Sequence, residues 1–179
     1  HWDHCGGALK FNDDKTKTEH IFPNARYHVS KSQWEWANNP NKREKAAYLK
    51  ENIEALSEDG RLNFVSDGQE FLSGITVRIF DGHTIGMTLP FINSPKGTIV
   101  FTADLIPSSV HIPIPWLASY DIQPMVAIKE KEDLLIEAAE KNYILFFEHD
   151  SQTEACTVEM TPKGVKLKDR ISLQHQSNS

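Results

Sequence analysis

The sequence predicts a mixed α/β (or α+β) fold in which helices cover β-sheets. Runs of β-branched and aromatic residues, such as Ile75 to Phe80 and Tyr143 to Phe147, are typical of strands. Other segments, such as Glu130 to Lys141, carry apolar residues at helical spacing. Strands and helices alternate irregularly along the chain, which excludes a helix bundle and a β-sandwich.

Composition limits the classes of partner. The chain has 179 residues, 39% of them hydrophobic, so we expect one domain over residues 1–179, with the polar residues 174–179 as a disordered tail. Nineteen Lys and Arg against 25 Asp and Glu give a net charge of −6 without any basic block, which argues against nucleic acid as a partner. No run of about 18 apolar residues is present, so we expect no membrane span. The two cysteines, Cys5 and Cys156, could form at most one disulfide, and we expect them to be reduced thiols of a cytoplasmic protein.

The first third of the chain is predicted to contain short elements. A glycine-containing loop leads into a short helix at the N-terminus, and a Ser-capped helix follows a short strand. Apolar residues at helical spacing then predict an amphipathic helix that ends before Gly60. The predicted ranges are loop 1–7, turn 22–25, strand 26–29, a helix carrying Gln33, Trp34 and Trp36, and helix 42–56.

The rest of the chain is predicted to form a sheet with one long helix. Short β-rich runs separated by Asp, Gly, Asn and Pro predict an antiparallel meander. The proline-rich segment Ile106 to Pro124 is expected to be a long loop, because proline breaks a helix interior. The predicted strands are 62–65, 75–80, 87–92, 98–101, 143–147, 157–160 and 165–167, with a helix over 130–141.

Histidines and aspartates follow several predicted strands. Imidazole nitrogen and carboxylate oxygen suit Zn, Fe, Mn, Co and Ni, so these side chains would form a metal site if they met at one sheet edge. Three other histidines, His20, His28 and His175, are interpreted as surface or half-buried side chains without a role. The candidate metal ligands are His1, Asp3, His4, His83, Asp104 and His149.

The order of these residues resembles the metallo-β-lactamase superfamily, whose members carry HxHxDH, a histidine in Gly-His-Thr, a bridging aspartate and a last histidine. The matching segments are His1-Trp2-Asp3-His4, Gly82-His83-Thr84, Thr102-Ala103-Asp104 and Glu148-His149-Asp150. The resemblance implies part of an αβ/βα sandwich, mainly its C-terminal half. Segments 22–27 and 111–116 look like the branch of acyl-homoserine-lactone lactonases and organophosphate hydrolases.

One departure concerns the first motif, since its first histidine would lie two residues before His1. We therefore expect the chain to be truncated inside this motif. By the resemblance, one metal position would use the missing histidine, His1 and His83, and the other would use Asp3, His4 and His149, with Asp104 bridging both. The resemblance implies one or two divalent metal ions, zinc first, with iron, manganese, cobalt or nickel as alternatives.

The resemblance also implies an activity, the hydrolysis of small-molecule esters, lactones or related substrates through a metal-bound hydroxide, impaired by the truncation. Asp3 would orient the hydroxide and protonate the leaving group. A tyrosine that some family lactonases place after the bridging aspartate is absent, because Leu105 follows Asp104. His111, Trp116 and Tyr120 are the candidate substrate contacts, with packing as their alternative role.

Other functions stay open. A thiolester hydrolase of glyoxalase type would share the ligands, and so would a di-iron oxidoreductase or a tRNA-processing nuclease, the last disfavoured by the acidic charge. A non-catalytic fragment is the alternative from another class. Loss of half a sandwich would expose apolar surface, so we expect a homo-oligomer.

Overall fold

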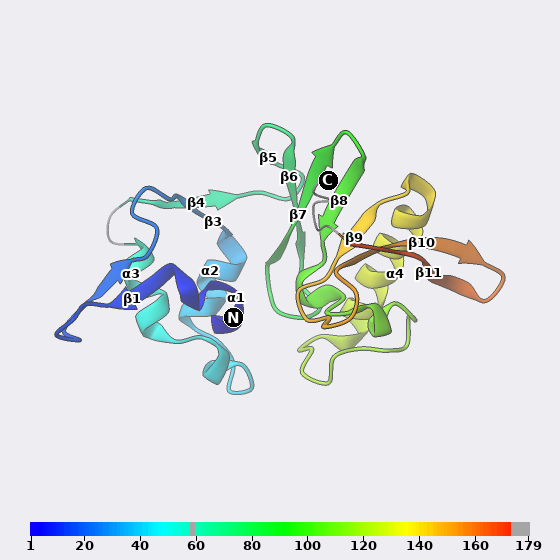
Figure 1. The fold of residues 1–179 in the computed structure, drawn as a ribbon. Helices are drawn as coiled ribbons and strands as arrows, with labels where there is room; N and C mark the ends of the chain where they lie inside the picture. The colour runs from blue at the N-terminus through cyan, green and yellow to red at the C-terminus, as the bar shows by residue number, and fades with distance from the viewer. Residues whose placement is uncertain (58–59, 173–179) are drawn as a thin grey trace. The chain divides into compact units, whose positions relative to one another are not determined.

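The computed structural model describes residues 1–57 and 60–172, so the tail predicted at 174–179 lies outside the described residues. The chain divides into two compact units, His1–Ser66 and Asp67–Ser179 (Figure 1). Among the described residues, the first unit has two small sheets and the second has one, and each unit has its own hydrophobic cluster. The single domain expected over residues 1–179 stays a prediction.

The first unit contains two small sheets and several short helices. Strands β1 (Leu9–Phe11) and β2 (Thr18–His20) form an antiparallel pair, and β3 (Tyr27–Ser30) pairs in parallel with β4 (Leu62–Val65). Its cluster of buried side chains consists of Ala8, Leu9 and Leu56, with Tyr27, Trp34 and Ala55 packed against it. The helices are α1 (Trp2–Cys5), α2 (Lys31–Asn38) and α3 (Glu54–Ser57), with 3₁₀ turns η1 (Gly6–Ala8), η2 (Lys45–Ala47) and η3 (Lys50–Asn52).

The Ser-capped helix of the sequence prediction is confirmed as α2. Ser30 is buried and extended at the N-cap, and its Oγ accepts the backbone N–H of Gln33 at 3.0 Å. This bond satisfies one of the amide groups that a helix leaves without a partner in its first turn. The side chain of Trp34 packs against the cluster of the first unit, so packing accounts for this tryptophan.

The helix predicted over residues 42–56 is wrong. The segment instead forms η2, η3 and α3, with extended residues between them. Asn41 Oδ1 accepts the N–H groups of Arg43 and Glu44, and both Glu44 and Tyr48 are buried. Burial of these two side chains on the inside competes with continuous helical hydrogen bonding, which amphipathic spacing alone does not reveal.

The second unit is a seven-stranded sheet with one long helix. The strand order is β11-β10-β9-β8-β7-β6-β5, and every described neighbouring pair is antiparallel except β8 and β9, which are parallel. The antiparallel meander expected between residues 61 and 101 is therefore confirmed for β6 to β8, but it is wrong for its first predicted strand, 62–65, which is β4 and pairs in parallel with β3 in the first unit. The strands are β5 (Glu70–Leu72), β6 (Ile75–Phe80), β7 (Met87–Ser94), β8 (Gly97–Phe101), β9 (Ile144–Phe146), β10 (Ala155–Thr161) and β11 (Gly164–Ile171).

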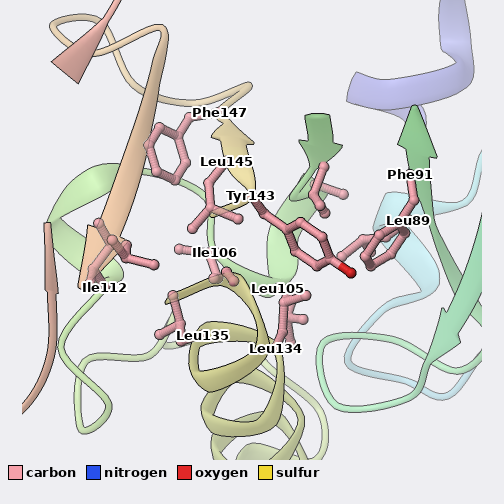
Figure 2. Close-up of a cluster of buried hydrophobic side chains, with 14 of the residues drawn as sticks. Leu89, Phe91, Leu105, Ile106, Ile112, Leu134, Leu135, Tyr143, Leu145 and Phe147 are labelled. Atoms are coloured by element: carbon pink, nitrogen blue, oxygen red, sulfur yellow. The ribbon is translucent and has the colours of Figure 1, made fainter. Parts of the chain in front are cut away.

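Helix α4 (Pro124–Lys141) covers this sheet through apolar contacts. Its Leu134, Leu135 and Ala138 are fully buried and belong to one cluster with Leu89, Val100 and Leu145 of the strands. Figure 2 shows these leucines of the helix facing Tyr143, Leu105 and Ile106. Burial of each such side chain contributes about 2 kcal/mol. The helix is therefore held firmly at the sheet face that its apolar stripe contacts.

The sequence placed the start of α4 too late, at Glu130. The helix begins at Pro124, because proline needs no N–H at the first helical position and its φ already suits a helix. It ends at Lys141, and the C-cap residue Asn142 adopts the left-handed conformation and donates its N–H to Ala138 O. Among the described residues, no helix combines the length and the apolar character needed to cross a bilayer.

A polar network joins α4 to the sheet beside the apolar cluster. Glu137 accepts hydrogen bonds from Arg78 on β6 at 2.5 Å, from Lys141 at 2.8 Å and from the Tyr143 hydroxyl at 2.9 Å. Burial opposes ionisation of this carboxyl, but the three hydrogen bonds outweigh it and lower the pKa of Glu137 to about 2. The ionised carboxylate therefore stabilises the contact between helix and sheet.

Substitution of this carboxylate tests its contribution. We expect Glu137→Gln to lower the free energy of unfolding by about 2 kcal/mol at pH 7, a magnitude typical of charged hydrogen bonds. The pKa of the folded state lies below the ordinary 4.5, so the contribution is complete above that pH and is lost as the pH falls towards 2. Urea unfolding across this pH range measures it. Glu140→Gln, at an exposed position of the same helix, is the control, and equal losses in both variants would contradict the assignment.

Candidate metal centre

Three predicted ligands of the second unit follow strands that run in the same direction. Strand β6 is antiparallel to β7, which is antiparallel to β8, and β8 is parallel to β9. The carboxyl ends of β6, β8 and β9 therefore lie at one edge of the sheet. His83 follows β6, Asp104 follows β8 and His149 follows β9. The topology thus brings these three residues of the prediction together.

The side chain of Asp104 lies between the two imidazoles. Its Oδ2 is 3.1 Å from His83 Nε2, and its Oδ1 is 3.3 Å from His149 Nε2. Asp104 and His83 are buried, whereas the His149 side chain is 39% exposed. One carboxylate therefore faces a nitrogen of each histidine with a separate oxygen, which is the arrangement that a bridging ligand requires.

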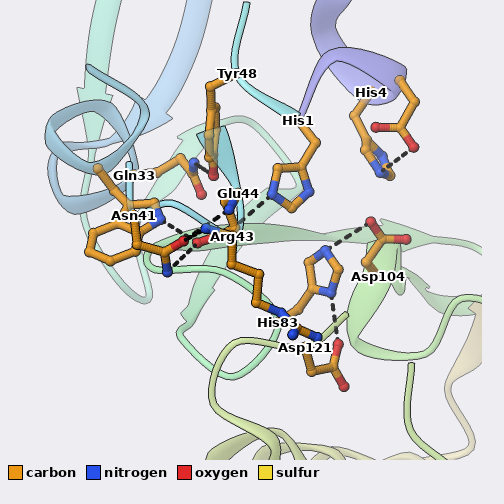
Figure 3. A network of polar contacts seen from close by, with 12 residues as sticks. His1, His4, Gln33, Asn41, Arg43, Glu44, Tyr48, His83, Asp104 and Asp121 are labelled. Carbon is orange, nitrogen blue, oxygen red and sulfur yellow. Dashed lines mark hydrogen bonds and ion pairs between the residues drawn. The ribbon is translucent and has the colours of Figure 1, made fainter. Parts of the chain in front are cut away.

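Asp121 holds the other side of the His83 ring and was missed in the sequence. His83 Nδ1 donates to Asp121 Oδ1 at 2.8 Å, so the ring lies between two carboxylates (Figure 3). Burial disfavours the imidazolium, but hydrogen bonds and charge from Asp104 and Asp121 outweigh it and raise the pKa of His83 to about 9. A carboxylate on the second nitrogen fixes the tautomer and orientation of a metal-binding histidine. No spacing in the sequence links residues 83 and 121.

The backbone that presents Asp104 is strained. Ala103 has a φ of +42°, a conformation that a Cβ atom disfavours by roughly 1–2 kcal/mol. The buried Thr102 holds the turn, because its Oγ1 donates to Ile106 O at 2.8 Å or to Phe146 O at 2.9 Å, which ends β9. The same threonine thus ties together the two strand ends that precede Asp104 and His149.

The loop before His83 is packed tightly against α4. A Cβ atom on Gly82 would lie 2.3 Å from Ala127 Cα, so no other residue fits without a shift of the backbone. Glu130 accepts the N–H groups of Asp81 at 2.8 Å and of Gly82 at 2.9 Å. Glycine at this position therefore serves the close approach of loop and helix.

A neighbouring aspartate fixes the loop of His149. Asp150 Oδ2 accepts the Ser109 N–H at 2.8 Å and its hydroxyl at 2.5 Å, and Oδ1 accepts the N–H groups of Gln152 and Thr153. The backbone N–H of His149 donates to Pro107 O at 3.1 Å. The loop that carries His149 is therefore joined to the start of the proline-rich segment.

The first unit carries the other three predicted ligands within one helical turn. Asp3 and His4 lie on α1, and His1 is its N-cap. His1 Nε2 donates to Glu44 Oε1 at 3.1 Å (Figure 3). Trp36 Nε1 donates to Glu44 Oε2 at 2.8 Å. The buried Glu44 thus holds the His1 ring as Asp121 holds that of His83, and the sequence prediction missed both carboxylates.

The three predicted substrate contacts all lie in the proline-rich segment of the second unit. The Tyr120 ring meets the His83 ring edge to face, with centroids 5.6 Å apart. Trp116 and Tyr120 are more than half exposed, and His111 Nδ1 lies 2.8 Å from Ser108 Oγ. Burial and the charge of Lys131 lower the pKa of His111, which favours the neutral imidazole. Tyr120 is therefore next to a candidate ligand, while substrate contact by any of the three stays a prediction.

The donor set suits a divalent transition metal. In the second unit it consists of two imidazole nitrogens and a carboxylate, and the first unit by itself carries two histidines and an aspartate within residues 1–4. Nitrogen and oxygen donors of this kind bind zinc and other late first-row ions. A fold that strains Ala103 to present Asp104 is consistent with a functional demand on that carboxylate.

Comparison with known proteins identifies the family. The model of the metallo-beta-lactamase superfamily matches residues 1–149, which is most of the chain. The chain therefore belongs to the metallo-beta-lactamase superfamily, as its motifs indicated. A search among curated proteins found no match.

Solved structures agree on the fold. A probable metal-dependent hydrolase from Staphylococcus aureus is 26% identical, with a TM-score of 0.81 over 96% of this chain and 61% of its own. AidC, a dizinc quorum-quenching lactonase, is 24% identical, with a TM-score of 0.74 over 97% and 63%. AbOPH, a hydrolase, is 22% identical, with a TM-score of 0.79 over 98% and 62%. This chain thus spans less than two thirds of the length of these structures.

The close packing of Gly82 predicts a severe effect of a single methyl group. We expect Gly82→Ala to lower the free energy of unfolding of the second unit by at least about 2 kcal/mol, because the new Cβ atom overlaps the backbone of α4. Urea unfolding measures the loss. Gly7→Ala is the control, since a Cβ atom there meets nothing within 4 Å, and a Gly82→Ala variant as stable as this control would refute the packing argument.

The hydrogen bond from His83 to Asp121 is open to direct measurement. In the metal-free chain, Asp121→Asn removes one of two carboxylates that favour the imidazolium, so the pKa of His83 should fall from about 9. NMR titration of the His83 ring protons follows this shift. Asp133→Asn, which alters an exposed aspartate on α4 that pairs with Lys129, should leave the His83 pKa in place. Identical titration curves for both variants would exclude the role given to Asp121.

Proposed function

We propose that this chain carries active-site residues of a metal-dependent hydrolase of small-molecule esters or lactones. The observation that carries the proposal is the placement of His83, Asp104 and His149 at the carboxyl ends of β6, β8 and β9, with Asp104 between the two imidazoles. Membership of the metallo-beta-lactamase superfamily supports it. The names of two structural relatives, a dizinc lactonase and a probable metal-dependent hydrolase, add support for this reaction class.

We assign the ligands by the family pattern. His1 and His83 would be ligands of one ion, and Asp3, His4 and His149 of a second, while Asp104 would be a ligand of both. When bound, a divalent ion lowers the pKa of coordinated water and polarises the carbonyl oxygen of a substrate. Zinc is the first choice, and the same donors also accept iron, manganese, cobalt or nickel.

The protein groups would orient and move protons. Asp121 keeps the proton of His83 on Nδ1 and therefore directs Nε2 towards Asp104. Glu44 accepts a hydrogen bond from Nε2 of His1. The other ring nitrogen of His1, Nδ1, is therefore the atom that would bind an ion. A carboxylate oxygen of Asp3 would take a proton from the attacking water and return it to the oxygen of the leaving alkoxide.

Substrate recognition would come from the proline-rich segment. Trp116 and Tyr120 present large exposed rings, and the Tyr120 ring lies against His83. Such rings suit an acyl or aromatic group attached to the reacting ester. A thiolester substrate of glyoxalase type is the second candidate, and the lactonase among the structural relatives favours the oxygen ester over it.

Self-association of the chain stays a prediction. In the first unit, Phe11, Phe22 and Phe64 expose more than half of their side-chain surface. Exposed aromatic groups of this kind are typical of surfaces that bind another protein. They support the expected homo-oligomer, and self-association of this kind is compatible with hydrolase activity.

Metal content and hydrolysis together test the proposed function. The chain is loaded with Zn²⁺, dialysed, analysed for zinc and assayed with an acyl lactone and an aryl ester. We expect zinc near stoichiometry in the wild type. Asp104→Asn should weaken zinc binding by more than about 100-fold, since the loss of a residue that only hydrogen-bonds to a metal ligand typically lowers metal affinity by about 10–100-fold. The rate of hydrolysis should fall with the zinc.

Two outcomes would contradict this proposal. Equal zinc content in the wild type and in Asp104→Asn would remove Asp104 from the site. Zinc at stoichiometry without hydrolysis of any ester, lactone or thiolester would leave a metal-binding protein without the proposed activity. Asp133→Asn, an exposed position on α4, is the matched control for the loss of one carboxylate.

A further inference from the structure

Helix α4 contains a lysine without any exposed surface. Lys131 is the largest fully buried side chain among the described residues. A buried ammonium group is costly unless hydrogen bonds replace its hydration. Burial lowers the pKa of Lys131 to about 8, against the opposing effect of the Asp121 carboxylate. The ammonium group is therefore still mainly protonated at neutral pH, so hydrogen-bond partners must stabilise its charge in the interior.

Those partners are three backbone carbonyls of one loop. Lys131 Nζ donates to His111 O at 3.0 Å, to Pro113 O at 3.1 Å and to Trp116 O at 2.7 Å. An ammonium has three N–H donors, so the set matches its full capacity. Pro113 and Pro115 lack an N–H group, which keeps this stretch out of regular secondary structure. These carbonyls therefore lack the N–H partners that a neighbouring strand would offer, and the lysine donates hydrogen bonds to them.

The loop lies between two candidate ligands of the metal centre. Before it, Pro107 O accepts the N–H of His149. After it, the carbonyl of His83 accepts the N–H of Ile122, and Asp121 holds His83 Nδ1. Lys131 binds the middle of the segment that joins these two attachments. The two ends therefore have their own attachments, and Lys131 supplies the attachment of the middle.

The residue before Lys131 performs the complementary task. Glu130 accepts two N–H groups of the loop that precedes His83, while Lys131 donates to carbonyls of the loop that follows Pro107. Two successive side chains of opposite charge thus attach two loops to the same helix. The helix is itself fixed to the sheet by Leu134 and Leu135, so it transmits the rigidity of the core to both loops.

We propose that Lys131 is a positioning residue that fixes the backbone of residues 111–116 and thereby the surface this loop offers to an acyl or aromatic group of the substrate. The part that concerns substrate rests on the proposed function. The part that concerns the loop does not, because it depends on hydrogen bonds within the second unit alone.

Hydrogen exchange tests the loop directly. Lys131→Met keeps the length of the side chain and removes all three donors. We expect amide exchange of Trp116 and Asp121, whose N–H groups bond within the loop, to increase at least about tenfold, while amides paired between β6 and β7 keep their rates. Lys129→Met, at an exposed position on the same helix, is the matched control. Equal loop exchange in Lys131→Met and Lys129→Met would overturn the proposal.

A second pair of variants decides the matter if Lys131→Met does not fold. Lys131→Arg retains the charge and several donors, whereas Lys131→Gln retains two neutral donors. The proposal requires slower loop exchange in the arginine variant than in the glutamine variant. Equal exchange in this pair would overturn it as well.

Steady-state kinetics test the link to substrate. With an acyl lactone, Lys131→Met should raise KM about tenfold and change kcat by less than about threefold, since the loop contacts the substrate away from the reacting atoms. A purely structural lysine would reduce the amount of folded enzyme and leave KM unchanged, and that result would overturn the substrate part. Absence of hydrolysis in the wild type would reject the proposed function, while the exchange experiment would still decide on the loop.

Discussion

The apolar contact between α4 and the seven-stranded sheet is the constraint on which the second unit depends. Leu134, Leu135 and Ala138 are fully buried against the strands, and close packing allows little shift of the helix. Glu130 and Lys131 hold the loops only because the next turn of α4 is anchored in the core.

Carboxylates that do not belong to the family motifs shape the candidate metal centre. Asp121 orients His83 and Glu44 orients His1, each through one ring nitrogen. Because a histidine has two nitrogens, a partner on one of them decides which nitrogen faces an ion. Local strain adds to this order, since Ala103 adopts a left-handed conformation beside Asp104. The candidate ligands His83 and His1 are thus oriented by residues that lie outside the family motifs.

Prediction of the elements succeeded where one local signal dominated and failed where tertiary contacts competed. Ser30 at a helix start and the alternating strands of the meander are local signals, and both were confirmed. The predicted helix over 42–56 had suitable spacing, but the buried Glu44 and Tyr48 favour short 3₁₀ turns there. Pro124 was interpreted as part of a loop, although it begins α4, because proline fits both positions equally well.

The sequence alone determined the class of this protein, since His83, Asp104 and His149 stand in recognisable motifs after strands whose types can be read from local patterns. Only the tertiary structure decided which groups support them. Strand direction places the three side chains at one edge, and long-range packing brings Asp121 to His83 and Lys131 to the carbonyls of its loop. Such partners are far apart in the chain, and their pairing depends on how α4 packs on the sheet, which no spacing of residues encodes.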